Sequence, residues 1–309
     1  GLINLGIKEG EHICIIGRNR PHLYWSIIAA QNVGAIPTPL YQDSVAQEMI
    51  FPISHCSAKM AIVENQEQVD KLLEIKKDIT SLKNIIYLDP RGLRNYKKNN
   101  LYSLNDVFTL KNIENVSKLQ TELKNRQSKQ NLDTKSILLY TSGTTGRSKG
   151  VVLSNRNVIE SGKAGIVFDN INSDFSLICY LPMAWVGDFA FSMGLGLQSG
   201  MCICCPESSE TLHDDMREIG PSYFFGPPRF FESLLTSVNL KIDDASSVKR
   251  KLFDYFMSIA KENGEKILEN KSVGLVNRIK YFFGEIFIYG PLKNRMGLTK
   301  TKVGYTAGE

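Results

Sequence analysis

The sequence predicts an α/β protein whose sheets are largely parallel and are covered by helices on both faces. Short apolar runs, which are typical of buried strands, alternate along the chain with longer segments of helical periodicity. Such alternation is characteristic of parallel sheets. The chain has 309 residues, of which 42% are hydrophobic, so it can bury a large core and is expected to contain more than one structural unit.

The first elements follow one another closely. Residues 12–17, HICIIG, form an uninterrupted apolar run, and Pro21 is suited to the first turn of a helix because its nitrogen carries no hydrogen to leave unpaired. Leu23, Ile27 and Ile28 then recur at helical spacing, which completes one βα unit. The further elements expected in this half are a strand at 59–63, an amphipathic helix at 66–79, a strand at 84–88, a strand at 136–140 and a helix at 155–168.

The same alternation continues through the second half of the chain. The expected strands are 177–181, 201–205, 223–225 and 302–306, and the expected helices are 188–197, 211–219 and one from Arg229. A long helix is predicted after Ser246 or Ser247, either of which can cap it. Its apolar stripe, which favours core packing, consists of Leu252, Phe253, Phe256, Met257 and Ala260. Gly264 and Asn270 are predicted to mark helix breaks.

The net charge of +5 is concentrated in one segment. Residues 91–130 contain nine Lys or Arg and three acids, a balance of +6, so the rest of the chain is about neutral. The segment has no closely interleaved aromatic residues on which bases could stack, which argues against a nucleic-acid interface. We expect a solvated, partly irregular excursion.

The cysteines give little support for a metal site. Cys202 and Cys205 have CxxC spacing, but no second pair follows and only His213 lies nearby downstream. Reduced thiols in the core of a cytoplasmic protein explain the cysteines better. The six are Cys14, Cys56, Cys179, Cys202, Cys204 and Cys205.

The run at residues 189–206 is uncharged and long enough to suggest a membrane helix. It is interrupted by Gly194, Gly196, Gln198, Ser199 and Gly200. The run therefore predicts a helix, a glycine break and a buried strand. The chain begins at Gly1 without an initiator methionine or the basic region of a signal peptide, so we expect a piece of a longer sequence.

The stretch LYTSGTTGRSKGVVLSNRN, residues 139–157, carries the chemical signal of the sequence. The strand at 136–140 stops at a block of glycine and hydroxyl residues that cannot continue a packed strand. Gly143, Gly146 and Gly150 allow successive backbone N–H groups to point into one anion-binding concavity. Hydroxyl donors and a mobile point charge are added by Thr141, Ser142, Thr144, Thr145 and Lys149. We expect the helix from Asn155 to add partial positive charge at its start.

Spacing separates the alternatives for this loop. A Walker loop requires glycine directly before the lysine and Ser or Thr after it, whereas Lys149 lies between Ser148 and Gly150. The dinucleotide fingerprint does not fit either, and a plain flexible turn would not need a lysine at a set place after a strand. The loop closely resembles the phosphate loop of the adenylate-forming enzymes, which comprise acyl-CoA synthetases, luciferases and peptide-synthetase adenylation domains. That family usually has proline at the position of Ser148.

The resemblance extends along essentially the whole chain. CYLPMAWVGD, residues 179–188, resembles the strand-end segment on the acyl side of the active site in acyl-CoA synthetases, where most relatives have histidine at the position of Trp185. EIGPSYFFGPPR, residues 218–229, and the adenine-side loop GYTAGE, residues 304–309, continue the likeness. Residues 18–41 resemble the first βα unit of long-chain acyl-CoA synthetases.

This resemblance implies two packed, largely parallel sheets flanked by helices, as in the large domain of those enzymes, with the C-terminal domain absent. The expected subdomains are residues 1–165 and 166–309, the second truncated. The implied substrates and cofactors are a long-chain fatty acid, ATP, Mg²⁺ and coenzyme A. Thr141 would contact magnesium and phosphate with Lys149 as its catalytic partner, and Trp185 and Phe189 would line the acyl pocket. The implied nucleotide-binding residues are Ser142, Gly143, Thr144, Thr145, Gly146, Gly308 and Glu309.

The function expected of the parent enzyme is ATP-dependent activation of a long-chain fatty acid to the acyl-adenylate and then to acyl-CoA. Two alternatives stay open: a non-catalytic nucleotide-binding piece, and an enzyme that activates an aryl acid or an amino acid. Amino-acid activators usually offer an acid to the substrate ammonium in the strand-end segment, where Asp188 stands here between Trp185 and Phe189. A cytoplasmic location is expected, with peripheral membrane contact as an option.

Overall fold

The computed structural model describes residues 1–97, 99–110, 116–141 and 148–307. The chain divides into two compact units. Unit 1 consists of Gly1–Asn172 and Cys179–Gly200, and unit 2 consists of Ser173–Ile178 and Met201–Glu309. The predicted α/β class, with largely parallel sheets flanked by helices, is confirmed within each unit. A subdomain boundary at residue 165 stays a prediction.

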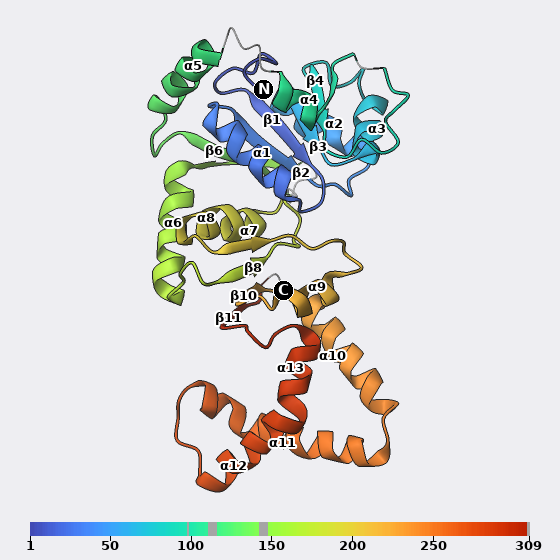
Figure 1. Ribbon diagram of the computed structural model, residues 1–309, viewed down its shortest axis with the longest axis vertical. Coiled ribbons are helices and arrows are strands. Elements are labelled where there is room, and N and C mark those ends of the chain that lie inside the picture. Colours follow the sequence, from blue (N-terminus) through green and yellow to red (C-terminus); the bar gives the residue numbers. More distant parts are fainter. Residues whose placement is uncertain (98, 111–115, 142–147, 308–309) are drawn as a thin grey trace. The chain divides into compact units, whose positions relative to one another are not determined.

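Unit 1 is built on a five-stranded parallel sheet with strand order β2-β1-β3-β4-β5 (Figure 1). Its strands are β1 (His12–Ile16), β2 (Ile36–Leu40), β3 (Met60–Val63), β4 (Asn84–Tyr87) and β5 (Leu101–Ser103). Its first six helices in the described residues are α1 (Pro21–Asn32), α2 (Ala46–His55), α3 (Gln66–Glu74), α4 (Leu104–Thr109), α5 (Val116–Ser128) and α6 (Asn155–Asp169). Helix α1 packs across β1, β2 and β3, as an apolar helix between parallel strands must.

Strand β2 was missed in the sequence because it contains two prolines. Ile36 donates its backbone N–H to Glu11 O at 2.8 Å, so the alternate residues Pro37 and Pro39 direct their nitrogens away from β1. Proline is tolerated in a strand only where no ladder hydrogen bond is required of it. Strand β6 (Lys135–Thr141) lies beside β2 and pairs instead with β7 (Lys149–Ser154) in an antiparallel hairpin.

The uncharged run at 189–206 lies in a continuous helical stretch of three parts as far as Ser199. These are α7 (Val186–Phe189), the π-helix η2 (Ala190–Gly196) and α8 (Leu197–Ser199). The predicted glycine break is confirmed at Gly200, with φ of 73°, and the predicted strand follows as β9 (Cys202–Cys204), but that strand is not buried. Gly162 of α6 lies so close to η2 that an added Cβ would be 2.5 Å from Gly194 O, so small residues here permit close helix packing. No helix of the described ranges is long and apolar enough to cross a membrane.

Unit 2 contains a four-stranded parallel sheet with strand order β11-β10-β8-β9. The strands are β8 (Ser176–Ile178), β9 (Cys202–Cys204), β10 (Tyr223–Phe225) and β11 (Val303–Tyr305). Helix α9 (Leu212–Ile219) precedes β10, and the remaining helices all lie between β10 and β11 in the chain (Figure 1). These are α10 (Pro228–Asp243), α11 (Ser247–Leu268), α12 (Leu275–Gly284), the π-helix η3 (Glu285–Tyr289) and α13 (Gly290–Met296).

Several local predictions are corrected by the structure. Helix α3 ends at Glu74, short of the predicted Ile79. Helix α11 runs through Gly264, so a break there was wrong, whereas Asn270 has φ of 54° just beyond the helix end, as predicted. Ser246 occupies the N-cap position of α11, but its side chain makes no capping hydrogen bond.

The described residues of the basic segment 91–130 carry β5, α4 and α5, which is more regular structure than the predicted excursion. Arg126 of α5 is buried and donates to Ile7 O and Val33 O. The charged composition of the segment could not predict this burial, because the acceptors lie 119 and 93 residues away in the sequence.

All six cysteines are free thiols. The core prediction fits Cys14 and Cys179, which are buried, but it is wrong for Cys202, which is exposed on the short strand β9. Among the described residues, no group of three or more His, Cys, Asp or Glu could hold a metal ion.

We predict that Gly297→Ala destabilises unit 2 while Gly304→Ala does not. Gly297 ends α13 with φ of 73°, and a Cβ there would lie 2.5 Å from the backbone of Met216 in α9. A left-handed alanine costs about 1–2 kcal/mol before that clash is counted. Gly304 of β11 has no atom within 4 Å of an added Cβ. Urea unfolding of both variants measures the difference, and equal midpoints would contradict this account of Gly297.

Candidate functional site

The two predicted catalytic residues form a cross-strand pair at the loop end of the β6–β7 hairpin. The antiparallel register places Thr141 opposite Lys149 and Tyr140 opposite Gly150. Directly opposed residues lie on the same face of the hairpin, with Cβ atoms about 4.5–5.5 Å apart. Both Thr141 and Lys149 are exposed. A hydroxyl and an ammonium are therefore available side by side at the two ends of the loop, whose residues 142–147 lie outside the described ranges.

The expectation that α6 adds its partial positive charge to this loop is wrong. Helix α6 begins at Asn155 as predicted, but β7 separates it from the loop, and Ser154 pairs with Lys135 at the opposite end of β6. The first turn is closed by its own capping box, in which Ser154 Oγ accepts from Asn157 N and Asn157 Oδ1 accepts from Ser154 N. The run GVVLS favours a strand because valine is β-branched.

Buried polar contacts hold β6 in place behind the exposed pair. Tyr140 donates its hydroxyl to Pro52 O at 3.1 Å, and His55 Nδ1 lies 2.8 Å from the same hydroxyl. Both contacts are satisfied when His55 Nδ1 carries a proton. Burial raises the pKa of Tyr140, so the phenol stays a donor at neutral pH. At the other end of β6, Gln31 donates to Ser136 Oγ at 2.9 Å. Helices α1 and α2 thus fix the hairpin.

A cavity of about 800 Å³ borders the loop end of the hairpin. Thr141, Ser148 and Tyr140 contribute to its wall, together with Ala184, the end of β2 and much of α2. Its polar lining comes from Glu48, Gln47, Ser44 and Ser54. The exposed hydroxyl of the cross-strand pair therefore lies at the edge of a hollow that can admit a ligand.

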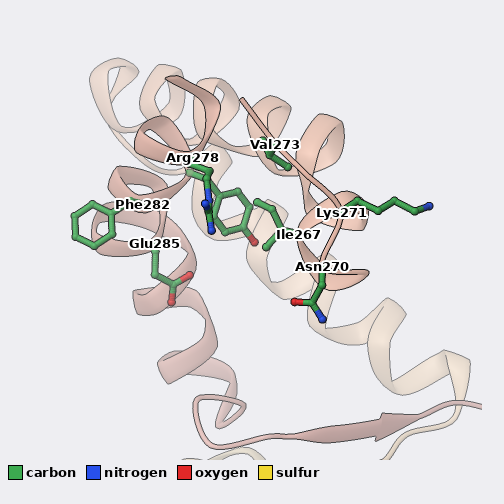
Figure 2. A pocket seen from close by; sticks show the side chains of 8 residues that line it. Ile267, Asn270, Lys271, Val273, Arg278, Phe282 and Glu285 are labelled. Atoms are coloured by element: carbon green, nitrogen blue, oxygen red, sulfur yellow. The ribbon is translucent and has the colours of Figure 1, made fainter. Parts of the chain in front are cut away.

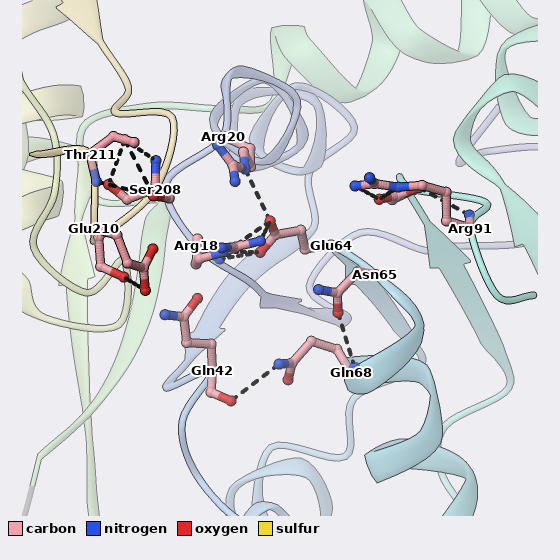
Figure 3. A network of polar contacts seen from close by, with 12 residues as sticks. Arg18, Arg20, Gln42, Glu64, Asn65, Gln68, Arg91, Ser208, Glu210 and Thr211 are labelled. Atoms are coloured by element: carbon pink, nitrogen blue, oxygen red, sulfur yellow. Dashed lines mark hydrogen bonds and ion pairs between the residues drawn. The ribbon is translucent and has the colours of Figure 1, made fainter. Parts of the chain in front are cut away.

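A second polar cluster lies where the strand order of the sheet reverses (Figure 3). Strands β2 and β3 pair with opposite sides of β1, and the crevice at the carboxyl ends of such strands is where open α/β sheets bind ligands. Here Glu64 accepts from Arg18 N at 2.8 Å and from Arg20 Nε at 3.0 Å. Burial acts to raise the pKa of Glu64, but the bonds from Arg18 and Arg20 hold it below its ordinary value. Glu64 therefore stays ionised, and its bonds join the turn after β1 to the turn after β3.

The sequence singled out Asp188 as the acid of the strand-end segment, but it did not predict that the carboxylate is buried. Tyr24 donates to Asp188 Oδ2 at 2.8 Å, and Asn19 Nδ2 lies 3.1 Å from Oδ1 and 2.9 Å from Leu181 O. Burial raises the pKa of Asp188 to about 7, although the bonds from Tyr24 and Asn19 lower it. An acid inside the apolar run from 179 to 189 was the available signal. Its partners in the first βα unit, up to 169 residues away, were not visible in the sequence.

Comparison with known proteins decides the family. A family model described as AMP-binding enzyme matches residues 1–279. The chain belongs to the AMP-binding enzyme family. The resemblance to adenylate-forming enzymes is thereby confirmed.

Relatives of this AMP-binding enzyme include long-chain-fatty-acid–CoA ligases. ACSBG1 from Rattus norvegicus is 25% identical over 99% of this chain and 42% of its own length. ACSBG2 from Homo sapiens is 27% identical over 96% of this chain and 44% of its own length. The chain thus spans less than half of these relatives.

A solved long-chain-fatty-acid-CoA ligase, FadD1 from Archaeoglobus fulgidus, is similar in structure with a TM-score of 0.61. It is 18% identical and covers 79% of this chain and 44% of its own. At that identity the likeness shows a shared fold.

The predicted pocket residues of this AMP-binding enzyme lie in the segment that Asp188 anchors. Phe189 is buried in α7, and Trp185 is half-buried with its ring so close to Gly187 that an added Cβ would be 1.8 Å away. Their role in an acyl pocket stays a prediction. The other predicted nucleotide-binding residues, Ser142, Gly143, Thr144, Thr145, Gly146, Gly308 and Glu309, lie outside the described ranges.

Asp188 should make the stability of this enzyme depend on pH. An acid whose pKa is raised by folding, here from 3.8 to about 7, binds its proton more tightly in the folded state. Its contribution to stability is therefore full below the unfolded pKa and is lost as the pH rises through about 7, by at most about 1.4 kcal/mol per pH unit. Asp188→Asn, which keeps an acceptor but cannot ionise, should remove this slope.

Urea unfolding at a series of pH values between those limits measures the effect. The control is Asp133→Asn, because Asp133 is exposed and its carboxylate pairs with Arg156 on the surface. Asp133→Asn should follow the wild-type curve. A difference between wild type and Asp188→Asn that did not change with pH would contradict the assignment.

Proposed function

We propose that this chain is part of an ATP-dependent long-chain fatty acid–CoA ligase. The observation that carries the proposal is the cross-strand pair of Thr141 and Lys149 at the base of the glycine-rich loop, beside a cavity of about 800 Å³. A phosphate group needs such donors and a mobile cation, and the exposed pair offers both. Family membership and ligase relatives support the reaction type.

The proposed reaction has two steps. A fatty acid carboxylate oxygen forms a bond to the α-phosphorus of ATP while the bond to the bridging oxygen breaks, and pyrophosphate leaves. The thiolate of coenzyme A then forms a thioester at the acyl carbon, and AMP leaves. The first step needs little covalent chemistry from the protein, so positioning and charge stabilisation supply most of the acceleration. Lys149 would hold the terminal phosphates as pyrophosphate charge develops.

Magnesium would fit beside Thr141. The described residues contain no cluster of three potential protein ligands, so a cage made by this part of the chain is not offered. Mg²⁺ commonly keeps several waters and takes substrate phosphate oxygens with one or two protein ligands. The exposed hydroxyl of Thr141 can be such a ligand, and the ion would neutralise phosphate charge there.

An apolar acyl substrate is favoured over an amino acid by the surroundings of Asp188. Asp188 is the acid of the strand-end segment, and its carboxylate is buried and bonded by Tyr24 and Asn19. A carboxylate that already has these partners is poorly placed to pair with a substrate ammonium, since it would have to give them up in a buried setting. Trp185 and Phe189 add apolar surface in the same segment.

The substrate class is tested with the full-length protein by ATP–pyrophosphate exchange. Palmitate should stimulate the exchange, whereas an equimolar mixture of amino acids or an aryl acid should not. Stimulation by an amino acid without any response to fatty acids of several chain lengths would overturn the proposed substrate.

Lys149→Ala in the full-length protein should slow adenylation about ten- to a hundredfold. The reason is that a charge-assisted contact contributes about 1.5–3 kcal/mol. Stability should change by less than about 0.5 kcal/mol, because Lys149 is exposed.

Lys163→Ala is the matched control, since Lys163 is an exposed lysine of α6 that pairs with Glu160. The control should retain the wild-type exchange rate. If Lys149→Ala exchanged pyrophosphate at the same rate as the wild type and Lys163→Ala, Lys149 would have no role at the phosphates.

A further inference from the structure

Unit 2 exposes a continuous apolar stripe along α12 and η3. Its members are each between 46% and 75% exposed, and they are Leu275, Val276, Ile279, Phe282, Phe283, Ile286 and Phe287. At about 100° per residue, these positions fall within ~140° of the helix circumference. Phe283 and Phe287 stack with ring centroids 6.4 Å apart. We call these seven residues the α12 apolar face.

The other side of the same helices is already packed. Tyr281, Ile288 and Tyr289 contact a small core with Phe256 and Ile259 of α11. The α12 apolar face therefore is not needed to attach α12 to α11. Seven large apolar side chains on one stripe also differ from the single exposed apolar residues that are common on protein surfaces.

Basic residues border the apolar face. Residues 269–296 contain five cations against Glu269 and Glu285, a balance of +3, and these two acids pair with Lys271 and Lys293. Arg278 and Lys280 fall on opposite borders of the stripe at helical spacing, and neither makes an ion pair within the part of the chain that is described. An apolar stripe flanked by cations is typical of a helix that lies in the interface of an anionic membrane.

A cavity of about 490 Å³ opens beside the face (Figure 2). Lys271 and Arg278 contribute to its lining, together with Phe282 and Glu285. In Figure 2 the ring of Phe282 projects from the helix while the Arg278 side chain lies toward Glu285. Lys271 pairs with Glu269, so a phosphate-bearing headgroup would meet Arg278 there while acyl chains contact the apolar face.

We propose that the α12 apolar face docks into the interface of an anionic phospholipid bilayer, with α12 parallel to the membrane plane. No helix of the described residues is both long and apolar enough to span a bilayer, which fits a helix lying on the surface. A second copy of the chain is a poorer occupant, because Arg278 and Lys280 at the borders of one face would repel the same cations of the other. The proposal rests on this surface and not on the fatty acid–CoA ligase assignment.

Vesicle co-sedimentation of the full-length protein tests the proposal. The vesicles are phosphatidylcholine alone and phosphatidylcholine with phosphatidylserine, each at low and high salt. We expect binding to the anionic vesicles that weakens as salt rises, because salt screens the attraction between the cations and the anionic headgroups. Phe282→Glu should lower the partition coefficient about ten- to a hundredfold, since it removes one aromatic side chain that the membrane would bury.

A charge variant and a matched control make the result specific. Lys280→Glu, which leaves the apolar face intact, should lower partitioning at least about fivefold, the factor expected for one cation. The control is Phe168→Glu, because Phe168 is 83% exposed on α6 of unit 1 and lies off the face. This control should bind as wild type does, and all variants should keep the wild-type melting temperature.

Two results would overturn the proposal. One is a full-length protein that does not bind anionic vesicles, in which case light scattering would tell whether a second copy covers the face or the rest of the chain does. The other is binding that Phe282→Glu and Phe168→Glu reduce equally. Loss of ligase activity with intact vesicle binding would overturn only the proposed function.

Discussion

The candidate site depends on the way β6 is held inside unit 1. Its inner end bonds to α1 through Ser136 and Gln31, and its outer end bonds to α2 through Tyr140, His55 and Pro52. These contacts are buried or half-buried, where an unpaired polar group would cost about 1–3 kcal/mol, so the strand has little freedom to shift. The exposed pair at the end of the hairpin inherits that rigidity. A phosphate site benefits because donors that are held in place lose less entropy when a ligand binds.

Asp188 illustrates how a buried acid can join segments that are distant in sequence. Its carboxylate gains hydrogen bonds from Tyr24 and Asn19, yet burial outweighs them and leaves the pKa near 7. Near neutral pH the Asp188 side chain therefore occurs both as the carboxylate and as the neutral acid. The strand-end segment with Trp185 is attached to the first βα unit through this contact, so the wall expected for the acyl tail and the start of α1 behave as one piece of structure.

Unit 2 combines a modest core with a large apolar surface. The cluster between α11 and η3 has three buried members, whereas α12 and η3 expose seven large apolar side chains on their outer side. Packing on the inner face holds such a helix in place, while its outer face stays accessible to a binding partner. The cations at its borders then favour a negatively charged environment over a second basic surface of the same kind.

Local patterns in the sequence were sufficient for the α/β class, for most strands and for the residue types of the phosphate loop, because burial imposes periods of two and 3.6 on neighbouring residues. Patterns of that kind could not reveal β2, where Pro37 and Pro39 interrupt the expected composition, nor the strand that separates α6 from the loop. The pairing of Thr141 with Lys149 depends on the register of β6 with β7. The Asn19–Asp188 contact joins residues 169 positions apart, and only the tertiary structure decides which distant groups share a buried space.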